Sequence, residues 1–173
     1  MPIPAALLAC AALSFAGNPQ SPSAETSVTI AGKAITIKYS APSLRGRQMF
    51  GVNGQISKDP TWPVWRAGAD EATALHTDAD LVINGLMVPK GDYTVFVLAN
   101  PSMPWQLIIN KQTKQWGLDY NDKMDLGRVP MTIVKPSAPI ETMKIMLSGS
   151  GGDKGKLQIE WENVIASVPF TVR

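Results

Sequence analysis

The chain has 173 residues, of which 45% are hydrophobic and 17% are charged, and its formal net charge is +2. This length is enough for one domain with a substantial core, and the composition excludes a disordered chain, which would carry more charge and fewer apolar residues. Lysine and arginine are scattered without the dense basic stripe of a nucleic-acid-binding protein, so no nucleic acid is expected as a partner. The 14 glycines and 14 prolines indicate frequent chain reversals.

Residues 1–16 are predicted to be a signal peptide. They carry no charged side chain, are too short to span a bilayer, and place the small residues Ser14 and Ala16 at favoured cleavage positions. We therefore expect an exported protein, periplasmic or extracellular, whose mature chain has no transmembrane segment. Cys10 is the only cysteine, and lipid anchoring there is not expected because too many apolar residues follow it. Residues 17–26, rich in proline and serine, are predicted to be a flexible polar tether.

Residues 27–173 are predicted to form a single all-β domain, an antiparallel sandwich of jelly-roll or Greek-key type with about ten strands and little helix. Apolar and polar residues alternate with the period of two that is typical of half-buried strands. In residues 156–164 this pattern turns Leu157, Ile159 and Trp161 inward. Residues 93–98 are almost entirely apolar, which predicts a strand buried on both faces. Turns are predicted at Ala31–Lys33, Asn84–Gly85, Pro89–Asp92 and Gly149–Gly155.

One segment, residues 68–81, contains the helix-forming residues alanine and glutamate, and a short helix is the main alternative there. However, Thr73, Leu75 and Thr77 alternate with Ala74 and His76, which favours a strand.

Five ordered stretches of the chain resemble one known family. They are AITIKYSAPSLRGRQMFG, VWRAGADEATAL, LVINGLMVPKGDYTVFVL, WQLIINKQTKQWG and LQIEWENVIASVPF. Together they are similar to the bacterial family called domain of unknown function 2911, from about Thr26 to the C-terminus. The resemblance implies an exported protein with one compact, mostly β domain, and it implies no reaction. The positions that match the family pattern are Tyr39, Pro42, Arg45, Gly46, Arg47, Trp65, Arg66, Gly68, Glu71, Thr73, Asn110, Trp116 and Gly117. Asp70 stands where the family usually has asparagine.

The main candidate site is the pair of Arg66 and Glu71. A guanidinium matches a carboxylate with two parallel hydrogen bonds, so the pair would either bind a ligand, orient a general base, or form a structural ion pair at the start of a strand. His76, the only histidine, is expected to have a surface or packing role, because it lacks the partners of a catalytic triad or a zinc site.

The stretch SLRGR is a second candidate, because it brings Arg45 and Arg47 together around Gly46. Two guanidinium groups in one loop indicate an anionic partner. That partner is either internal, at Asp70 or Glu71, or external, such as a phosphate, a sulfate or an acidic sugar.

Aromatic residues complete the predicted ligand-binding set of Tyr39, Arg45, Arg47, Arg66, Glu71 and Trp116. Trp116 would either stack on a flat ligand or cover an open end of the sandwich. Residues 119–125 carry several side-chain oxygens, but their spacing departs from a calcium-binding loop, so an ordinary polar turn is expected. No metal site and no cofactor are expected.

Three functions remain open at this point. The first is a ligand-binding or interaction module with a pocket containing arginine and glutamate, for a small anionic or sugar-like ligand. The second is a hydrolase or isomerase that uses Glu71 as general base and Arg66 or Arg45 as electrostatic clamp. The third is a purely structural envelope protein in which every charge is paired internally.

Overall fold

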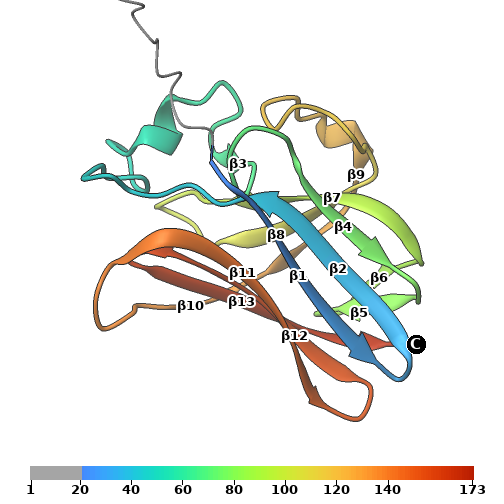
Figure 1. Ribbon diagram of the computed structural model, residues 1–173. Coiled ribbons are helices and arrows are strands. Elements are labelled where there is room, and N and C mark those ends of the chain that lie inside the picture. The colour runs from blue at the N-terminus through green and yellow to red at the C-terminus, as the bar shows by residue number, and fades with distance from the viewer. Residues whose placement is uncertain (1–20) are drawn as a thin grey trace, which may run out of the picture.

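Two antiparallel sheets packed face to face make up the computed structural model, which describes residues 21–173 (Figure 1). The first sheet has the strand order β1-β2-β4-β7-β8-β9, with β3 paired to β7, and the second has the order β11-β12-β13-β5-β6, with β10 paired to β13. The fold is therefore the expected all-β sandwich. The predicted signal peptide at residues 1–16 lies outside the described residues.

The strands are β1 (Ser23–Ile30), β2 (Lys33–Ser40), β3 (Val64–Trp65), β4 (Thr73–Thr77), β5 (Leu81–Ile83), β6 (Leu86–Val88), β7 (Gly91–Leu98), β8 (Gln106–Asn110), β9 (Asp125–Pro130), β10 (Thr132–Val134), β11 (Ile140–Gly151), β12 (Lys154–Glu162) and β13 (Val164–Val172). Two short 3-10 helices, η1 (Gln55–Lys58) and η2 (Asp122–Met124), lie in the longer connections. The 13 strands exceed the expected ten in part because β3 and β6 have only two or three residues, too few for a repeating pattern.

The predicted boundary between tether and domain at residue 27 is wrong. Strand β1 begins at Ser23, which is paired with Ser40, and Glu25 is paired with Lys38. The four extra residues are polar or small, so they lack an apolar pattern. They become strand because the complementary edge of β2 is available to them.

Three other local expectations are confirmed, whereas the turn predicted at Gly149–Gly155 is shorter, because β11 runs to Gly151 and β12 begins at Lys154. Residues 73–77 form a strand, β4, whose residues are alternately buried and exposed. The Asn84–Gly85 turn joins β5 to β6, and both of its residues have the positive φ, 43° and 91°, that such a hairpin needs. Leu157, Ile159 and Trp161 of β12 all point into the core, with exposed fractions of 1–2%.

Large aromatic side chains fill one part of the core between the sheets. Trp65 and Trp161 are stacked with ring centroids 5.9 Å apart, and Phe50 meets both rings edge to face. Trp161 also donates a hydrogen bond through its indole nitrogen to the carbonyl of Glu141. The aromatic packing ties the connection between β2 and β4, which carries Phe50, to both sheets.

Strand β7 is buried on both faces because a second apolar cluster lies outside the sandwich. Phe96 and Leu98 of β7 pack there with Ile108 of β8 and Val64 of β3, and Tyr120 partly covers them. The segment that carries Tyr120, residues 111–124, therefore folds back over the outer face of the first sheet.

A polar network holds this segment in place. Asn110, which is fully buried, donates hydrogen bonds to the carbonyl of Asn121 and to the carboxylate of Asp125, both at 2.9 Å. The Tyr120 hydroxyl donates to Asp125 at 2.7 Å and accepts from Arg128, also at 2.7 Å. Burial and the hydrogen bond to Asp125 raise the pKa of Tyr120 well above its usual range, so its hydroxyl stays protonated. The segment consequently forms a fixed wall beside the sheet.

No helix among residues 21–173 is long and apolar enough to cross a membrane.

Candidate functional site

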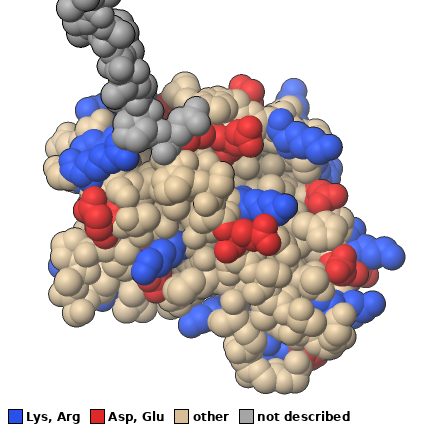
Figure 2. Space-filling view, in the orientation of Figure 1, with Lys and Arg blue, Asp and Glu red and all other residues tan. Residues whose placement is uncertain are grey.

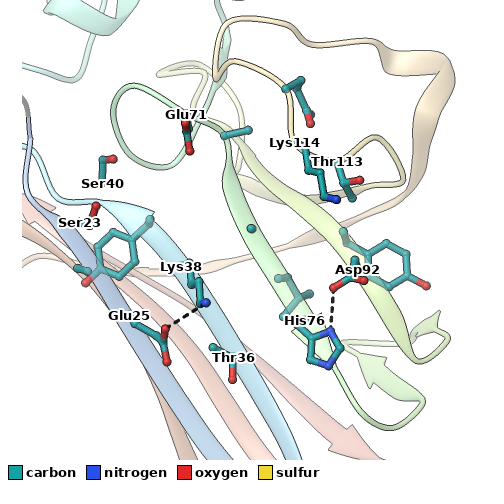
Figure 3. A pocket seen from close by; sticks show the side chains of 17 residues that line it. Ser23, Glu25, Thr36, Lys38, Ser40, Glu71, His76, Asp92, Thr113 and Lys114 are labelled. Atoms are coloured by element: carbon teal, nitrogen blue, oxygen red, sulfur yellow. Dashed lines mark hydrogen bonds and ion pairs between the residues drawn. The ribbon is translucent and has the colours of Figure 1, made fainter.

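A groove of about 940 Å³ lies on the outer face of the first sheet (Figure 3). Its floor consists of outward-facing side chains of β1, β2, β4 and β7. The small side chain of Ala74 lies in the middle of this floor, and residues 113–115 of the folded-back segment line the groove beside it. The lining residues that carry polar groups are Ser23, Glu25, Thr36, Lys38, Tyr39, Ser40, Glu71, His76, Asp92, Tyr93, Thr113, Lys114 and Gln115.

The charges on the groove floor form pairs across neighbouring strands. Lys38 and Glu25 are register partners, and their charged atoms are 3.6 Å apart. His76 and Asp92 are also register partners, with 2.7 Å between Nδ1 and the carboxylate. Strand register thus brings opposite charges together on this face. Both pairs appear as dashed lines in Figure 3.

His76 is held between two carboxylates. Its Nδ1 contacts Asp92, and its Nε2 lies 3.0 Å from Asp78. The hydrogen bond to Asp92, followed by that to Asp78, raises the pKa of His76 above its usual value. The imidazole is half-exposed, as expected of a surface residue, and it contributes to the groove floor.

The rim of the groove is formed where two distant segments meet. Glu71 forms an isolated β-bridge with Trp116, the amide of Ala72 donates to the carbonyl of Gln115 at 3.2 Å, and the amide of Gly117 donates to the carbonyl of Asp70 at 3.0 Å. A Cβ on Gly117 would collide with the Arg66 side chain and would lie 2.6 Å from the Asp70 carbonyl oxygen. Glycine is therefore the residue that permits this close approach.

The expected ion pair between Arg66 and Glu71 does not form. None of the ion pairs among residues 21–173 includes either residue. Instead the Arg66 guanidinium reaches the carbonyl oxygen of Asp70 at 3.4 Å, and its side chain packs against Gly117. The chain between the two side chains is not an extended strand, because Ala67 and Asp70 both adopt left-handed conformations, with φ at 48° and 57°.

Arg66 has a different acidic neighbour, Asp59. Burial raises the pKa of Asp59, and the positive charge of Arg66 counteracts part of this rise. Nothing in the local sequence links the two residues, because their proximity depends on the path of the long connection between β2 and β4.

The SLRGR loop lies apart from the groove. Arg45 and Gly46 both have positive φ, 49° and 73°, and form a tight turn. The Arg47 guanidinium donates to the carbonyls of Leu44 and Ser43 in its own loop, and the backbone amide of Arg45 donates to the carboxylate of Glu141. The acidic side chain that contacts this loop is therefore Glu141, and it accepts its hydrogen bond from a backbone amide. The internal alternative considered above was a contact between an arginine guanidinium and the carboxylate of Asp70 or Glu71.

Of the predicted ligand-binding residues, the structure brings only Glu71 and Tyr39 to the groove. The Tyr39 hydroxyl accepts a hydrogen bond from the amide of Ile145 on β11, so it also ties the two sheets together. Trp116 is 49% exposed and is not among the lining residues, although its bridge to Glu71 places it on the same rim.

Sequence reasoning missed most of the groove, including Glu25, Lys38, Asp92, Lys114 and Gln115. The outward positions of the first hairpin could have pointed to Glu25 and Lys38. The other residues come from strands and loops whose pairing a single sequence does not reveal. Among residues 21–173 no group of three or more histidine, cysteine, aspartate or glutamate side chains is placed to hold a metal ion.

One model of a known protein family matches most of the chain. The family model described as "Protein of unknown function (DUF2911)" matches residues 21–170. The chain belongs to this family. Curated proteins and solved structures provide no match. Six of the positions predicted above to match the family pattern, Arg66, Gly68, Glu71, Thr73, Trp116 and Gly117, lie in the two segments that meet at the rim, where Thr73 also donates to the carbonyl of Ala67 at 2.8 Å.

Proposed function

We propose that the protein is an exported binding module that holds a small polar ligand in the outer groove. The observation that carries this proposal is the groove itself, a hollow of about 940 Å³ lined by hydroxyl, carboxylate, ammonium, imidazole and amide groups. This volume is in the range of small-molecule sites, which are about 300–1,000 Å³. Export rests on the apolar segment at residues 1–16.

The charge of the lining favours some ligands over others. Three carboxylates, of Glu25, Glu71 and Asp92, face two ammonium groups, of Lys38 and Lys114, and the imidazole of His76, whose pKa is raised. The lining therefore carries no excess of positive charge to attract a purely anionic ligand, so the groove supports a ligand with hydroxyl groups, such as a sugar, or one with charges of both signs. Figure 2 shows a similar mixture of acidic and basic side chains on the face that it displays.

The arginines do not support the catalytic alternative. That hydrolase or isomerase would use Glu71 as general base with Arg66 or Arg45 as the electrostatic clamp beside it. Neither Arg66 nor Arg45 lines the groove that Glu71 borders. A purely structural role is less well supported, because Arg45 and Arg47 remain exposed and have no carboxylate partner within ion-pair distance among the described residues.

The test is an NMR titration of the ¹⁵N-labelled protein with a panel of mono- and disaccharides, uronic acids, amino acids, short peptides, inorganic phosphate and sulfate. We expect amide shifts confined to the groove strands. Ala74→Trp would fill the floor and abolish them, whereas Ser148→Trp, on an exposed position of β11, would not. Shifts that map elsewhere, or that survive Ala74→Trp, would refute the proposal.

A further inference from the structure

Two charged side chains at the groove rim have no ion-pair partner. The charges on the floor are matched, since Lys38 pairs with Glu25 and His76 pairs with Asp92. Among residues 21–173 no ion pair includes Glu71 or Lys114, and both residues line the groove. The groove therefore presents one free carboxylate and one free ammonium group to a ligand.

The backbone keeps these two groups apart on adjacent segments. Glu71 is bridged to Trp116, and Lys114 lies two residues before Trp116 in the chain. The hydrogen bond from the amide of Ala72 to the carbonyl of Gln115 fixes the segments relative to each other. Both side chains are exposed, and Figure 3 shows them above the paired charges, with Glu71 on one side of the groove and Lys114 on the other.

Lys114 is held in an unusual backbone conformation. Its φ is 64°, in the left-handed region that costs a non-glycine residue about 1 kcal/mol or more. The neighbouring bridge and the buried Thr94 hydroxyl, which donates to the carbonyl of Gln112 at 2.8 Å, keep the loop in this shape. The ammonium group is thus carried by a constrained turn beside the groove, which reduces the ordering cost of binding a ligand.

We infer that the ligand of this groove is a zwitterion, an amino acid or short peptide with both ends free. Its ammonium group would bind the Glu71 carboxylate, and its carboxylate would bind the Lys114 ammonium group. Hydroxyl groups of Ser40 and Thr113 also line the groove and would be available to the peptide bonds. This inference rests on the proposed function and names the ligand class for the same groove.

The experiment measures the affinity of the protein for trialanine by calorimetry, with N-acetylated and C-amidated trialanine as matched probes. Each blocking group should weaken binding by about fivefold, the effect of one partly exposed charge pair. Glu71→Gln should weaken the binding of trialanine to the same extent and remove the further effect of N-acetylation on affinity. Lys114→Met should also weaken the binding of trialanine to this extent and should remove the further effect of C-amidation. The controls Glu160→Gln and Lys144→Met, on the second sheet, should change nothing.

The outcomes separate the two proposals. If a sugar or a simple anion binds in the groove and Ala74→Trp abolishes that binding, while trialanine does not bind, the zwitterion inference is overturned and the binding function stands. If both blocked peptides bind as tightly as trialanine, the inference is also overturned. If no probe shifts the groove residues, both proposals fail.

Discussion

Replacing Gly117 with alanine should destabilise the protein by about 1–3 kcal/mol, the usual effect of forcing an extra carbon into a packed site. The added Cβ would collide with the Arg66 side chain and lie 2.6 Å from the carbonyl oxygen of Asp70. The flexible arginine can move, but the carbonyl is backbone and accepts the Gly117 amide at 3.0 Å. The two segments must therefore separate, which breaks the rim between Glu71 and Trp116.

Urea denaturation followed by circular dichroism measures this loss, and the thermal midpoint should fall by about 3–10 °C. Gly149→Ala is the matched control, because a Cβ there has no heavy atom within 4 Å. It should change the free energy of unfolding by no more than about 0.5 kcal/mol. If the two variants unfold at the same urea concentration, the close approach at Gly117 does not hold the rim together and the reasoning is refuted.

Three further predictions concern the wall and the floor of the groove. Asn110→Ala should lower the free energy of unfolding by about 2–4 kcal/mol in urea denaturation, because it removes the three hydrogen bonds of a fully buried side chain; a loss below about 1 kcal/mol would contradict this. Gln115→Met should leave stability within about 1 kcal/mol or raise it, because the buried Gln115 Nε2 has no hydrogen-bond partner among residues 21–173 and only Oε1 accepts a bond, from Thr94 at 3.3 Å; a larger loss would contradict this. NMR titration should find the pKa of His76 above its usual value of about 6.5, and Asp92→Asn should lower it. Since the pKa of His76 is raised in the folded protein, the contribution of its contacts with Asp92 and Asp78 to stability is complete below about pH 6.5 and disappears as the pH rises through the folded pKa. An unchanged pKa of His76 in Asp92→Asn would contradict the assigned contact.

Local signals accounted for much of the fold. The Asn84–Gly85 turn and the alternation in β4 and β12 depend on neighbouring residues, so their physical causes lie within short stretches of the chain. The start of β1 was missed for the opposite reason. Ser23 to Thr26 have no apolar pattern of their own and are ordered by pairing with Lys38, Ile37 and their neighbours on β2.

The candidate site was less predictable than the fold. Arg66 and Glu71 are close in sequence, and an ion pair between them is chemically reasonable. Two left-handed residues between them, Ala67 and Asp70, turn the chain, so that Arg66 lies against the chain near Gly117 and Glu71 borders the groove. Backbone conformation at these positions thus decided which charges can meet.

The sequence by itself determined the fold class, the hairpin turns and the inward faces of the main strands, because hydrophobic period and turn chemistry act over a few residues. Only the tertiary structure decided where the charges lie relative to one another. Strand register paired Lys38 with Glu25 and His76 with Asp92, and the folded-back segment brought Lys114 to the rim beside Glu71. Glu25 and Lys38 share one hairpin, whereas the other contacts join strands and loops whose positions follow from sheet order and loop path, which one sequence does not encode locally.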